Sequence, residues 1–163
     1  MQVRHTETED IDVVLDLYAH ARQRMRDAGN PNQWTTEYPT RENILKDIEN
    51  GNSYVLTDDD GIAGTFAFII GEEPTYAYIE DGEWPDDLPY GSIHRLAGYR
   101  NRKGVFEAVL DFCSKRIERI RIDTHADNRP MLHLMEKCGF RRCGIVYMQN
   151  GTPRIAFSKT YIR

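Results

Sequence analysis

Residues 120–140 limit the folds open to this chain more than any other stretch. Ile120 and Ile122 predict a short buried strand, and a polar turn follows it and ends at Asn128. A helix is expected to begin there, because an asparagine side chain can accept a hydrogen bond from an unpaired amide of the first turn. Gly139 predicts the end of that helix, since glycine readily adopts the left-handed conformation of a helix stop. The stretch therefore predicts a strand, a helix and a second strand in succession.

The rest of the chain alternates between helical and strand patterns. Helices are predicted from the capping pattern of Thr6 and Glu9 to near Ala28, and from Thr40 to Gly51. Two further helices are predicted over residues 103–117 and 128–138. Strands are predicted at an N-terminal edge through Val3 and over residues 53–57, 62–70, 75–79, 92–97, 120–124, 143–148 and 154–159. This order predicts one mixed sheet with helices on both faces.

Length and charge restrict the class of protein. A chain of 163 residues is long enough for one domain with a sizeable core, so a single domain over residues 1–163 is expected. The net charge of -5 gives no general reason to expect a nucleic-acid partner. The longest mostly apolar run, residues 62–70, is far shorter than the roughly 20 residues of a membrane-spanning helix, so no membrane partner is expected.

The N-terminus and the cysteines favour a cytoplasmic setting. Acidic residues from Glu7 onward precede any apolar run, which argues against a signal peptide. The three cysteines show neither a CxxC pair nor the spacing of metal ligands, so no metal site is expected. An odd number of thiols without a secretion signal is typical of reduced cysteines, and a cytoplasmic location is expected.

Residues 93–106 are predicted to form a strand, a basic loop and the start of a helix. The first amides of a helix are unpaired and carry partial positive charge, which favours an anion. Gly104 lets a pyrophosphate approach the backbone, and three neighbouring basic residues add charge: Arg100, Arg102 and Lys103. The same pattern also occurs in ordinary solvated turns, so both readings stay open for this segment alone.

Together, residues 93–106 and 121–140 resemble the C-terminal half of the GNAT-superfamily N-acetyltransferases. The resemblance implies an α/β fold with a central mixed sheet of about seven strands and about four flanking helices. The cofactor loop of that family has the pattern Gln/Arg-x-x-Gly-x-Gly/Ala, which falls here on residues 101–106. Its central glycine is present, whereas Asn101 and Phe106 stand where the family usually has other residues.

The resemblance implies acetyl-CoA as the co-substrate and assigns roles to this loop. Amides at the start of the helix would hold the pyrophosphate, and the backbone of the preceding strand would bond the pantetheine arm. The implied cofactor-binding residues are Leu96, Gly98, Lys103, Gly104, Val105, Phe106 and Asn128.

Transfer of an acetyl group to an amine needs a base and a donor that stabilises the oxyanion. His94 is the first candidate base, because it lies on the predicted central strand and imidazole exchanges protons near neutral pH. The alternative is a hydrogen-bonded interior histidine. His125 directly follows a strand and could reach the same cleft, or could hold its turn together through hydrogen bonds. Glu80 and Asp81 are weaker candidate bases.

GNAT proteins commonly build the acceptor pocket from the loop between the first two helices. Trp34 and Tyr38 are the candidate substrate-binding residues in that loop, since an aromatic wall suits an amine. A tryptophan that fills the core under the loop is the alternative. Tyr147 and Arg154, on the final hairpin, could also face the acceptor.

Met135 stands where the family often has a tyrosine that protonates the leaving thiolate. Two functions therefore stay open. One is an N-acetyltransferase that moves an acetyl group from acetyl-CoA to a primary amine by direct attack in a ternary complex, because no covalent nucleophile set is visible. The other is a non-catalytic acyl-CoA-binding regulatory module.

The expected acceptor is a small molecule, because the chain is compact and residues 72–87 carry seven carboxylates without Lys or Arg. The family resemblance also leaves a homodimer open, with the apolar C-terminal hairpin as the pairing surface. A nucleotide-binding protein of another class is disfavoured, because neither a Walker loop nor a G-x-G-x-x-G motif follows a predicted strand.

Overall fold

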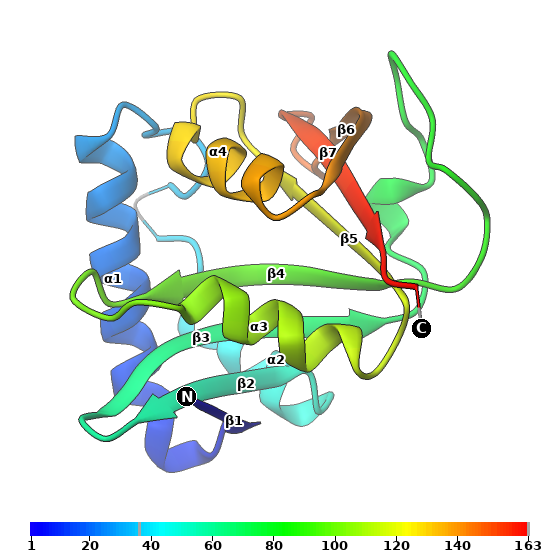
Figure 1. The fold of residues 1–163 in the computed structure, drawn as a ribbon. Coiled ribbons are helices and arrows are strands. Elements are labelled where there is room, and N and C mark those ends of the chain that lie inside the picture. The colour runs from blue at the N-terminus through cyan, green and yellow to red at the C-terminus, as the bar shows by residue number, and fades with distance from the viewer. Residues whose placement is uncertain (36, 163) are drawn as a thin grey trace.

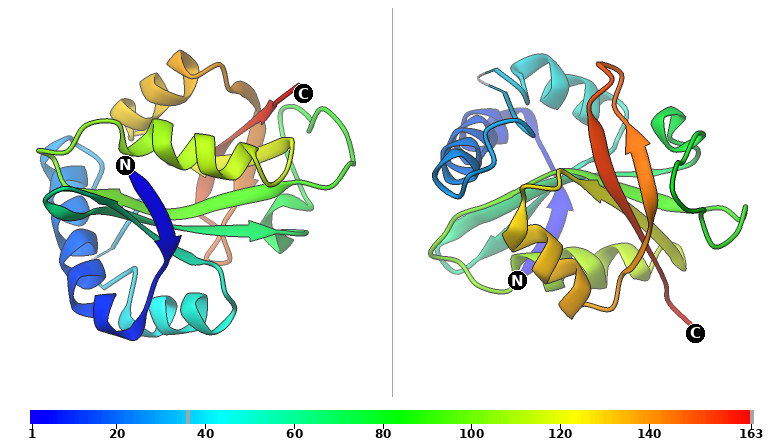
Figure 2. Two further views of the ribbon diagram at one scale, coloured as in Figure 1. Left: turned by 60° about the horizontal axis from the view of Figure 1, so that its bottom comes forward. Right: turned by 90° about the horizontal axis from the view of Figure 1, so that it is seen from above.

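The sheet and its helices follow the predicted α/β architecture. The computed structural model describes residues 1–35 and 37–162. Within these residues seven strands form one mixed sheet with α-helices on both faces. Helices α1 (Ile11–Asp27) and α2 (Arg41–Glu49) lie on one face, and α3 (Val105–Ser114) and α4 (Arg129–Lys137) lie on the other (Figure 1, Figure 2).

The strands lie side by side in the order β1-β2-β3-β4-β5-β7-β6. Their bounds are β1 (Gln2–His5), β2 (Ser53–Asp58), β3 (Gly61–Ile70), β4 (Gly91–Gly98), β5 (Arg119–Thr124), β6 (Arg141–Tyr147) and β7 (Pro153–Thr160). Neighbouring strands are antiparallel except β4 and β5, which are parallel. A parallel pair needs a crossover connection, and α3 supplies it.

The parallel pair in the middle of the sheet holds together over a short distance only. Gly91 pairs with Ile120 and Ser92 pairs with Arg121, and the ladder then stops. β5 remains paired with β7 along its whole length. β4 and β5 therefore diverge toward their carboxyl ends, and the edge of β4 beyond Ser92 faces an opening instead of a strand (Figure 1).

A bulge at Arg95 bends β4 where the opening begins. The register with β3 shifts between Thr65 and Ala67, and Arg95 has a φ of +49°. This conformation costs a non-glycine residue about 1–2 kcal/mol. The Arg95 guanidinium donates two hydrogen bonds of 2.7 Å to the carboxylate of Asp47 on α2, and both side chains are largely buried. We infer that this bidentate pair holds the bulge in place, and a bulge bends its strand.

Two local predictions are wrong. The strand predicted over residues 75–79 is instead a single 3-10 turn, η2 (Pro74–Tyr76), followed by one isolated bridge between Glu80 and Ile145. Proline favours the first position of such a turn, and the Glu73 carboxylate caps it by accepting from the Thr75 backbone amide at 3.4 Å and also from the Thr75 hydroxyl at 2.9 Å.

The start of α1 is the second correction. The predicted pairing of Thr6 with Glu9 is displaced by one residue, because Asp10 accepts from the Glu7 amide at 2.8 Å. Thr6 is instead buried against β2, where its hydroxyl lies 2.7 Å from that of Ser53.

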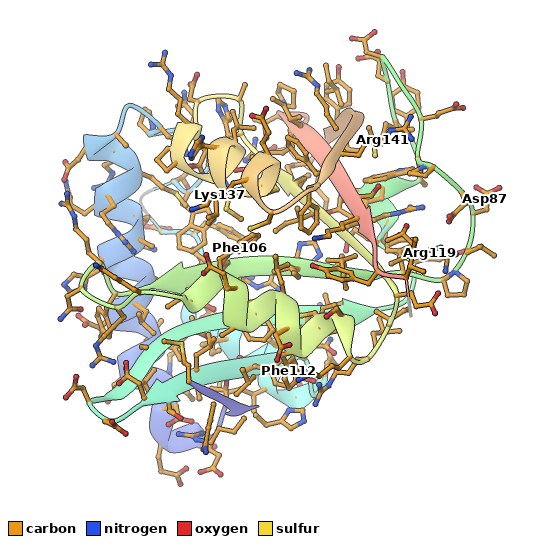
Figure 3. All side chains as sticks on the ribbon, viewed as in Figure 1. Asp87, Phe106, Phe112, Arg119, Lys137 and Arg141 are labelled. Carbon is orange, nitrogen blue, oxygen red and sulfur yellow. The ribbon has the colours of Figure 1, made fainter. Side chains whose placement is uncertain are left out.

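Residues 71–90 form a long connection that docks against β6 and the start of β5. Asp86 accepts from Arg119 at 3.0 Å, and Arg119 lies beside the part of this connection that carries Asp87 (Figure 3). The bridge between Glu80 and Ile145 fixes the other side. Gly144 lies at that contact, where an added Cβ atom would stand 2.6 Å from the Glu80 carbonyl oxygen.

Gly144→Ala is expected to lower the free energy of unfolding by about 3 kcal/mol, because the methyl group overpacks the docked connection. Gly151→Ala is the matched control. Its φ of +84° is also positive, but an added Cβ meets no atom within 4 Å, so a loss of about 1 kcal/mol is expected. Denaturant unfolding measures both values, and equal losses would contradict the tight contact.

Candidate functional site

The divergence of β4 and β5 lies between two cavities. The α3 cavity, of about 720 Å³, is bounded by α1, the turn after β4, and the starts of α3 and α4. The α2 cavity, of about 740 Å³, is bounded by the loop before α2, the connection before β4, and strands β4 and β5. The same four residues line both: Met25, Leu96, Asn128 and Met131. The two cavities therefore meet at the divergent strands.

The α3 cavity brings together every residue that the sequence predicted for cofactor binding. Its lining includes Leu96, Gly98, Lys103, Gly104, Val105, Phe106 and Asn128. Leu96 and Gly98 lie on the part of β4 that has no partner on the side of β5. A free strand edge of this kind can hydrogen-bond an extended ligand as an added strand would.

Gly104 turns the chain from β4 into α3. Its φ is +81°, and an added Cβ would meet no atom within 4 Å, so the conformation and not the space requires glycine. The first amides of α3 have no intrahelical acceptor and carry partial positive charge. Phe106, which departs from the family pattern, is 4% exposed and its ring lies 6.4 Å from that of Phe140, in the layer between α3 and α4 (Figure 3).

The basic residues of the loop between β4 and α3 differ in their ion pairing. Arg102 donates to the Asp58 carboxylate at 2.6 Å and to the Asp60 carbonyl at 3.3 Å, which ties it to the turn between β2 and β3. Arg100 and Lys103 line the α3 cavity without an ion-pair partner among the described residues. The sequence did not single out Arg24 of α1, which lines the same cavity.

Gln33 connects the loop before α2 to the end of β5. Its Oε1 accepts from the Thr124 hydroxyl, the Asn128 side-chain amide and the His125 backbone amide at 3.0, 3.0 and 3.2 Å. Asn128 in turn caps α4 by accepting from the Met131 amide. Hydrogen bonds between segments distant in sequence therefore hold the residues at the junction of the two cavities, and no local motif predicts these bonds.

His94 lines the α2 cavity, and its side chain is 17% exposed. Its Nε2 lies 2.8 Å from the Ser92 hydroxyl and 3.8 Å from the Glu73 carboxylate. The Ser92 hydroxyl lies 3.5 Å from the Ile69 carbonyl, to which it can donate, and from this contact we assign the His94 proton to Nε2, which leaves Nδ1 unprotonated. Burial and the Arg95 charge lower the pKa of His94 to about 3, which keeps the ring neutral near pH 7.

His125 lies outside the lining of both cavities. Its Nδ1 accepts from the Asp127 amide at 3.0 Å, and its own backbone amide donates to Gln33. These contacts are those of a residue that holds the turn before α4 together, which is the second of the two roles that the sequence left open.

Trp34 and Tyr38 both line the α2 cavity. The Trp34 ring is also buried. It makes T-shaped contacts with the rings of Tyr18 and Tyr38, at centroid distances of 5.6 and 6.3 Å. Trp34 therefore packs in the core and also forms part of the cavity wall. The Tyr38 hydroxyl accepts from Arg95 at 3.3 Å, which links this wall to the bulge in β4.

Two further carboxylates line the α2 cavity near His94. Asp123 accepts from the buried Tyr76 hydroxyl at 2.7 Å, and burial raises the pKa of its carboxyl although that hydrogen bond opposes the rise. Glu73 has no Lys or Arg partner within ion-pair distance among the described residues. Arg154 also lines this cavity and donates to the Gln33 carbonyl at 3.3 Å.

The remaining sequence candidates lie outside both linings. Glu80 accepts a hydrogen bond from Tyr147, and neither these two residues nor Asp81 line a cavity. Met135 is fully buried in the core layer under α4, whereas Met131 and Leu134 of the same helix line the α3 cavity.

Two features are absent from the described residues, 1–35 and 37–162. They contain no group of three or more His, Cys, Asp or Glu side chains arranged to hold a metal ion. None of their helices combines the length and the apolar character that a membrane crossing requires.

Comparison with known proteins agrees with this geometry. The sequence profile of the Acetyltransferase (GNAT) family matches residues 16–140. The chain is similar to a crystal structure of a GNAT-family acetyltransferase from Streptococcus agalactiae 2603, with a TM-score of 0.90 and 30% identity over 99% of this chain and 96% of that one. No curated protein matches the chain.

More distant structures share the fold alone. A ribosomal-protein-alanine N-acetyltransferase from Brucella melitensis has a TM-score of 0.61 and 15% identity, over 98% of this chain and 99% of that one. An aminoglycoside 6'-acetyltransferase type Ii has a TM-score of 0.60 and 16% identity, over 100% and 99%. Their named acceptors differ in kind, so the fold does not specify the acceptor.

The seven-stranded mixed sheet with α-helices on both faces is the fold of the GNAT acetyltransferase structures to which the chain is similar. With the profile match and the relative from S. agalactiae, the chain belongs to the GNAT family of acetyltransferases.

His94→Asn is expected to remove a pH-dependent loss of stability. The native pKa of about 3 lies below the value of 6.5 for an unperturbed histidine, so below pH 6.5 the unfolded chain binds the proton first. Wild type should then lose about 1.4 kcal/mol per pH unit, or about 2 kcal/mol more than the variant at pH 5 relative to pH 7.5. Denaturant unfolding at both pH values measures this difference.

The control for this experiment is His20→Asn, which removes an exposed histidine from α1. It should follow the wild-type pH dependence. If His94→Asn follows it too, His94 does not have a depressed pKa.

Proposed function

We propose that the protein transfers an acetyl group from acetyl-CoA to a primary amine of a small molecule. One observation carries the proposal: the divergence of β4 and β5 joins a cavity bordered by helix amides and an excess of cationic side chains to a cavity that holds the neutral His94 and the Glu73 carboxylate. The α3 cavity also includes Asp27 and Glu107, and in the α2 cavity Lys46, Arg95 and Arg154 stand beside Asp47, Glu73 and Asp123. A phosphate-bearing donor and an amine acceptor are the chemical complements of those two linings.

The residues of the α3 cavity fit acetyl-CoA, which supplies an acetyl group activated as a thioester. The edge of β4 that β5 leaves unpaired offers the Leu96 backbone groups and the Gly98 amide to an extended pantetheine arm, whereas the Gly98 carbonyl already accepts from Arg24. The amides that follow Gly104 suit a pyrophosphate, because they are unpaired and lie at the positive end of α3. The Asn128 side chain stands at the junction with the α2 cavity.

The α2 cavity fits an amine. A primary ammonium group has three donors, and the cavity presents acceptor atoms on Glu73, Asp123 and His94. Trp34 and Tyr38 add an aromatic wall to the same cavity. A volume of about 740 Å³ lies within the usual range of about 300–1,000 Å³ for small-ligand sites, which supports a small-molecule acceptor.

His94 acts as the base in this proposal. The acceptor first loses one proton to solvent, and the neutral amine nitrogen then forms a bond to the thioester carbon while the unprotonated Nδ1 takes the second proton that this nitrogen must lose. The carbon–sulfur bond breaks, and the CoA thiolate takes up a proton from solvent or from the imidazolium. The buried ring is a weak base by itself. The Glu73 carboxylate, 3.8 Å from Nε2, stabilises the imidazolium that this proton transfer creates.

Direct transfer in a ternary complex is the route that the cavities favour. Cys113, Cys138 and Cys143 are the cysteines of the chain, and none of them lines either cavity. Burial also raises the pKa of the Cys113 thiol, which disfavours a thiolate nucleophile there.

A non-catalytic acyl-CoA-binding module is the second candidate. Met135 favours it, because a buried thioether replaces the tyrosine that the family often uses as the acid for the thiolate. Both candidates require acyl-CoA binding, so only turnover separates them.

Gly104→Asp is expected to weaken acetyl-CoA binding by at least ten-fold, because a carboxylate at the start of α3 repels the pyrophosphate. Gly51→Asp is the matched control: its φ of +70° is also positive and its surroundings are open, but it lines neither cavity. Titration calorimetry measures both variants and wild type. Absence of acetyl-CoA and CoA binding to wild type would refute the proposed function.

His94→Asn is expected to reduce turnover by about 10²–10⁴-fold, the usual contribution of a general base. Thiol release from acetyl-CoA, followed over a panel of primary amines, measures this rate. His133→Asn, on the exposed side of α4, should leave the rate unchanged. Acetyl-CoA binding without turnover of any amine would favour the non-catalytic module.

A further inference from the structure

Arg24 comes from α1, far in sequence from the cofactor loop, yet its side chain reaches the end of β4. Its Nη2 donates a hydrogen bond to the Gly98 carbonyl, and Arg24 lines the α3 cavity. The turn after β4 lies against α1 at this point (Figure 1). The hydrogen bond therefore holds a guanidinium at the mouth of the cavity, beside the start of α3.

The charge of Arg24 has no carboxylate partner within ion-pair distance in the described residues. Two other cavity-lining arginines are matched by carboxylates, Arg95 by Asp47 and Arg102 by Asp58. The buried Arg121 and Arg154 hydrogen-bond only to neutral groups among the described residues, so it is the position of Arg24 beside the start of α3, and not its lack of a carboxylate alone, that points to an anion. The Gly98 carbonyl is a neutral acceptor and cannot compensate a full charge.

A second cation adds to the uncompensated positive charge at the α3 cavity. Arg100 lines the same cavity and also lacks an ion-pair partner among the described residues. Burial and the charge of Arg100 lower the pKa of Arg24, so the two guanidinium groups repel each other in the free protein. An anion between them would relieve this repulsion, and guanidinium binds phosphate oxygens through two parallel hydrogen bonds.

We propose that Arg24 and Arg100 form a phosphate clamp on the α1 side of the α3 cavity, in addition to the amides at the start of α3. The clamp rests on the proposed function, because its ligand is a phosphate group of acetyl-CoA, either in the pyrophosphate or at the 3′ position. Arg24 thereby takes the place that the sequence suggested for Arg102, whose guanidinium is engaged by Asp58.

Arg24→Gln tests the clamp against three probes: acetyl-CoA, its 3′-dephospho form, and S-acetylpantetheine, which carries no phosphate. Loss of a charge-assisted contact should weaken acetyl-CoA binding about ten-fold and leave S-acetylpantetheine within about two-fold. Calorimetry measures the first two probes, and displacement of acetyl-CoA measures the weaker third. If the 3′-dephospho form loses as much as acetyl-CoA, the clamp binds the pyrophosphate; if it loses nothing, the clamp binds the 3′-phosphate.

Two variants complete the design. Arg26→Gln removes an exposed arginine from the same helix and should leave all three affinities unchanged. Arg24→Lys keeps the charge but loses the planar fork, so its affinity for acetyl-CoA should lie between those of wild type and Arg24→Gln.

Two results would overturn the clamp alone: unchanged acetyl-CoA binding by Arg24→Gln, or an equal loss with S-acetylpantetheine, which would mark Arg24 as a structural brace for Gly98. Failure of the wild-type protein to bind acetyl-CoA would overturn the clamp and the proposed function together.

Discussion

The loss of pairing between β4 and β5 after two residue pairs is the constraint on which the rest of this structure depends. A continuous ladder would close the middle of the sheet and leave no room for a ligand between its strands. Here β5 stays with β7, and a bulge bends β4 away. The buried pair of Arg95 and Asp47 offsets the strain of a left-handed arginine, so an electrostatic contact between α2 and the sheet maintains the opening.

Both cavities are assembled from segments distant in sequence, and their linings differ in chemistry for that reason. The α3 cavity receives helix amides from the β4–α3 turn and a guanidinium from α1. The α2 cavity receives Glu73 from the long connection before β4 and Asp123 from β5. Gln33 ties these elements together through its single side-chain oxygen. The site is thus a property of the packing of several elements and not of one motif.

Local sequence signals were sufficient for the capped helices, the turn from β4 into α3 and most strands, because caps, glycine stops and periodicity act within a few residues. They failed at residues 75–79, where an alternating pattern suggested a strand. There Pro74 and the Glu73 cap stabilise a 3-10 turn, and the Tyr76 hydroxyl is drawn to Asp123. They also could not distinguish a catalytic His125 from one that holds a turn, since its partners Gln33 and Asp127 come from different parts of the fold.

By itself, the sequence determined the α/β class, the GNAT resemblance and the turn from β4 into α3, because these rest on contacts between chain neighbours and on glycine conformations. Only the tertiary structure decided which charges are compensated. Arg102 and Arg95 find carboxylates across the fold, while Arg24 and Arg100 do not. It also decided that His94 is neutral, since burial beside Arg95 sets its pKa. Compensation and burial depend on distances between remote residues, which local spacing does not specify.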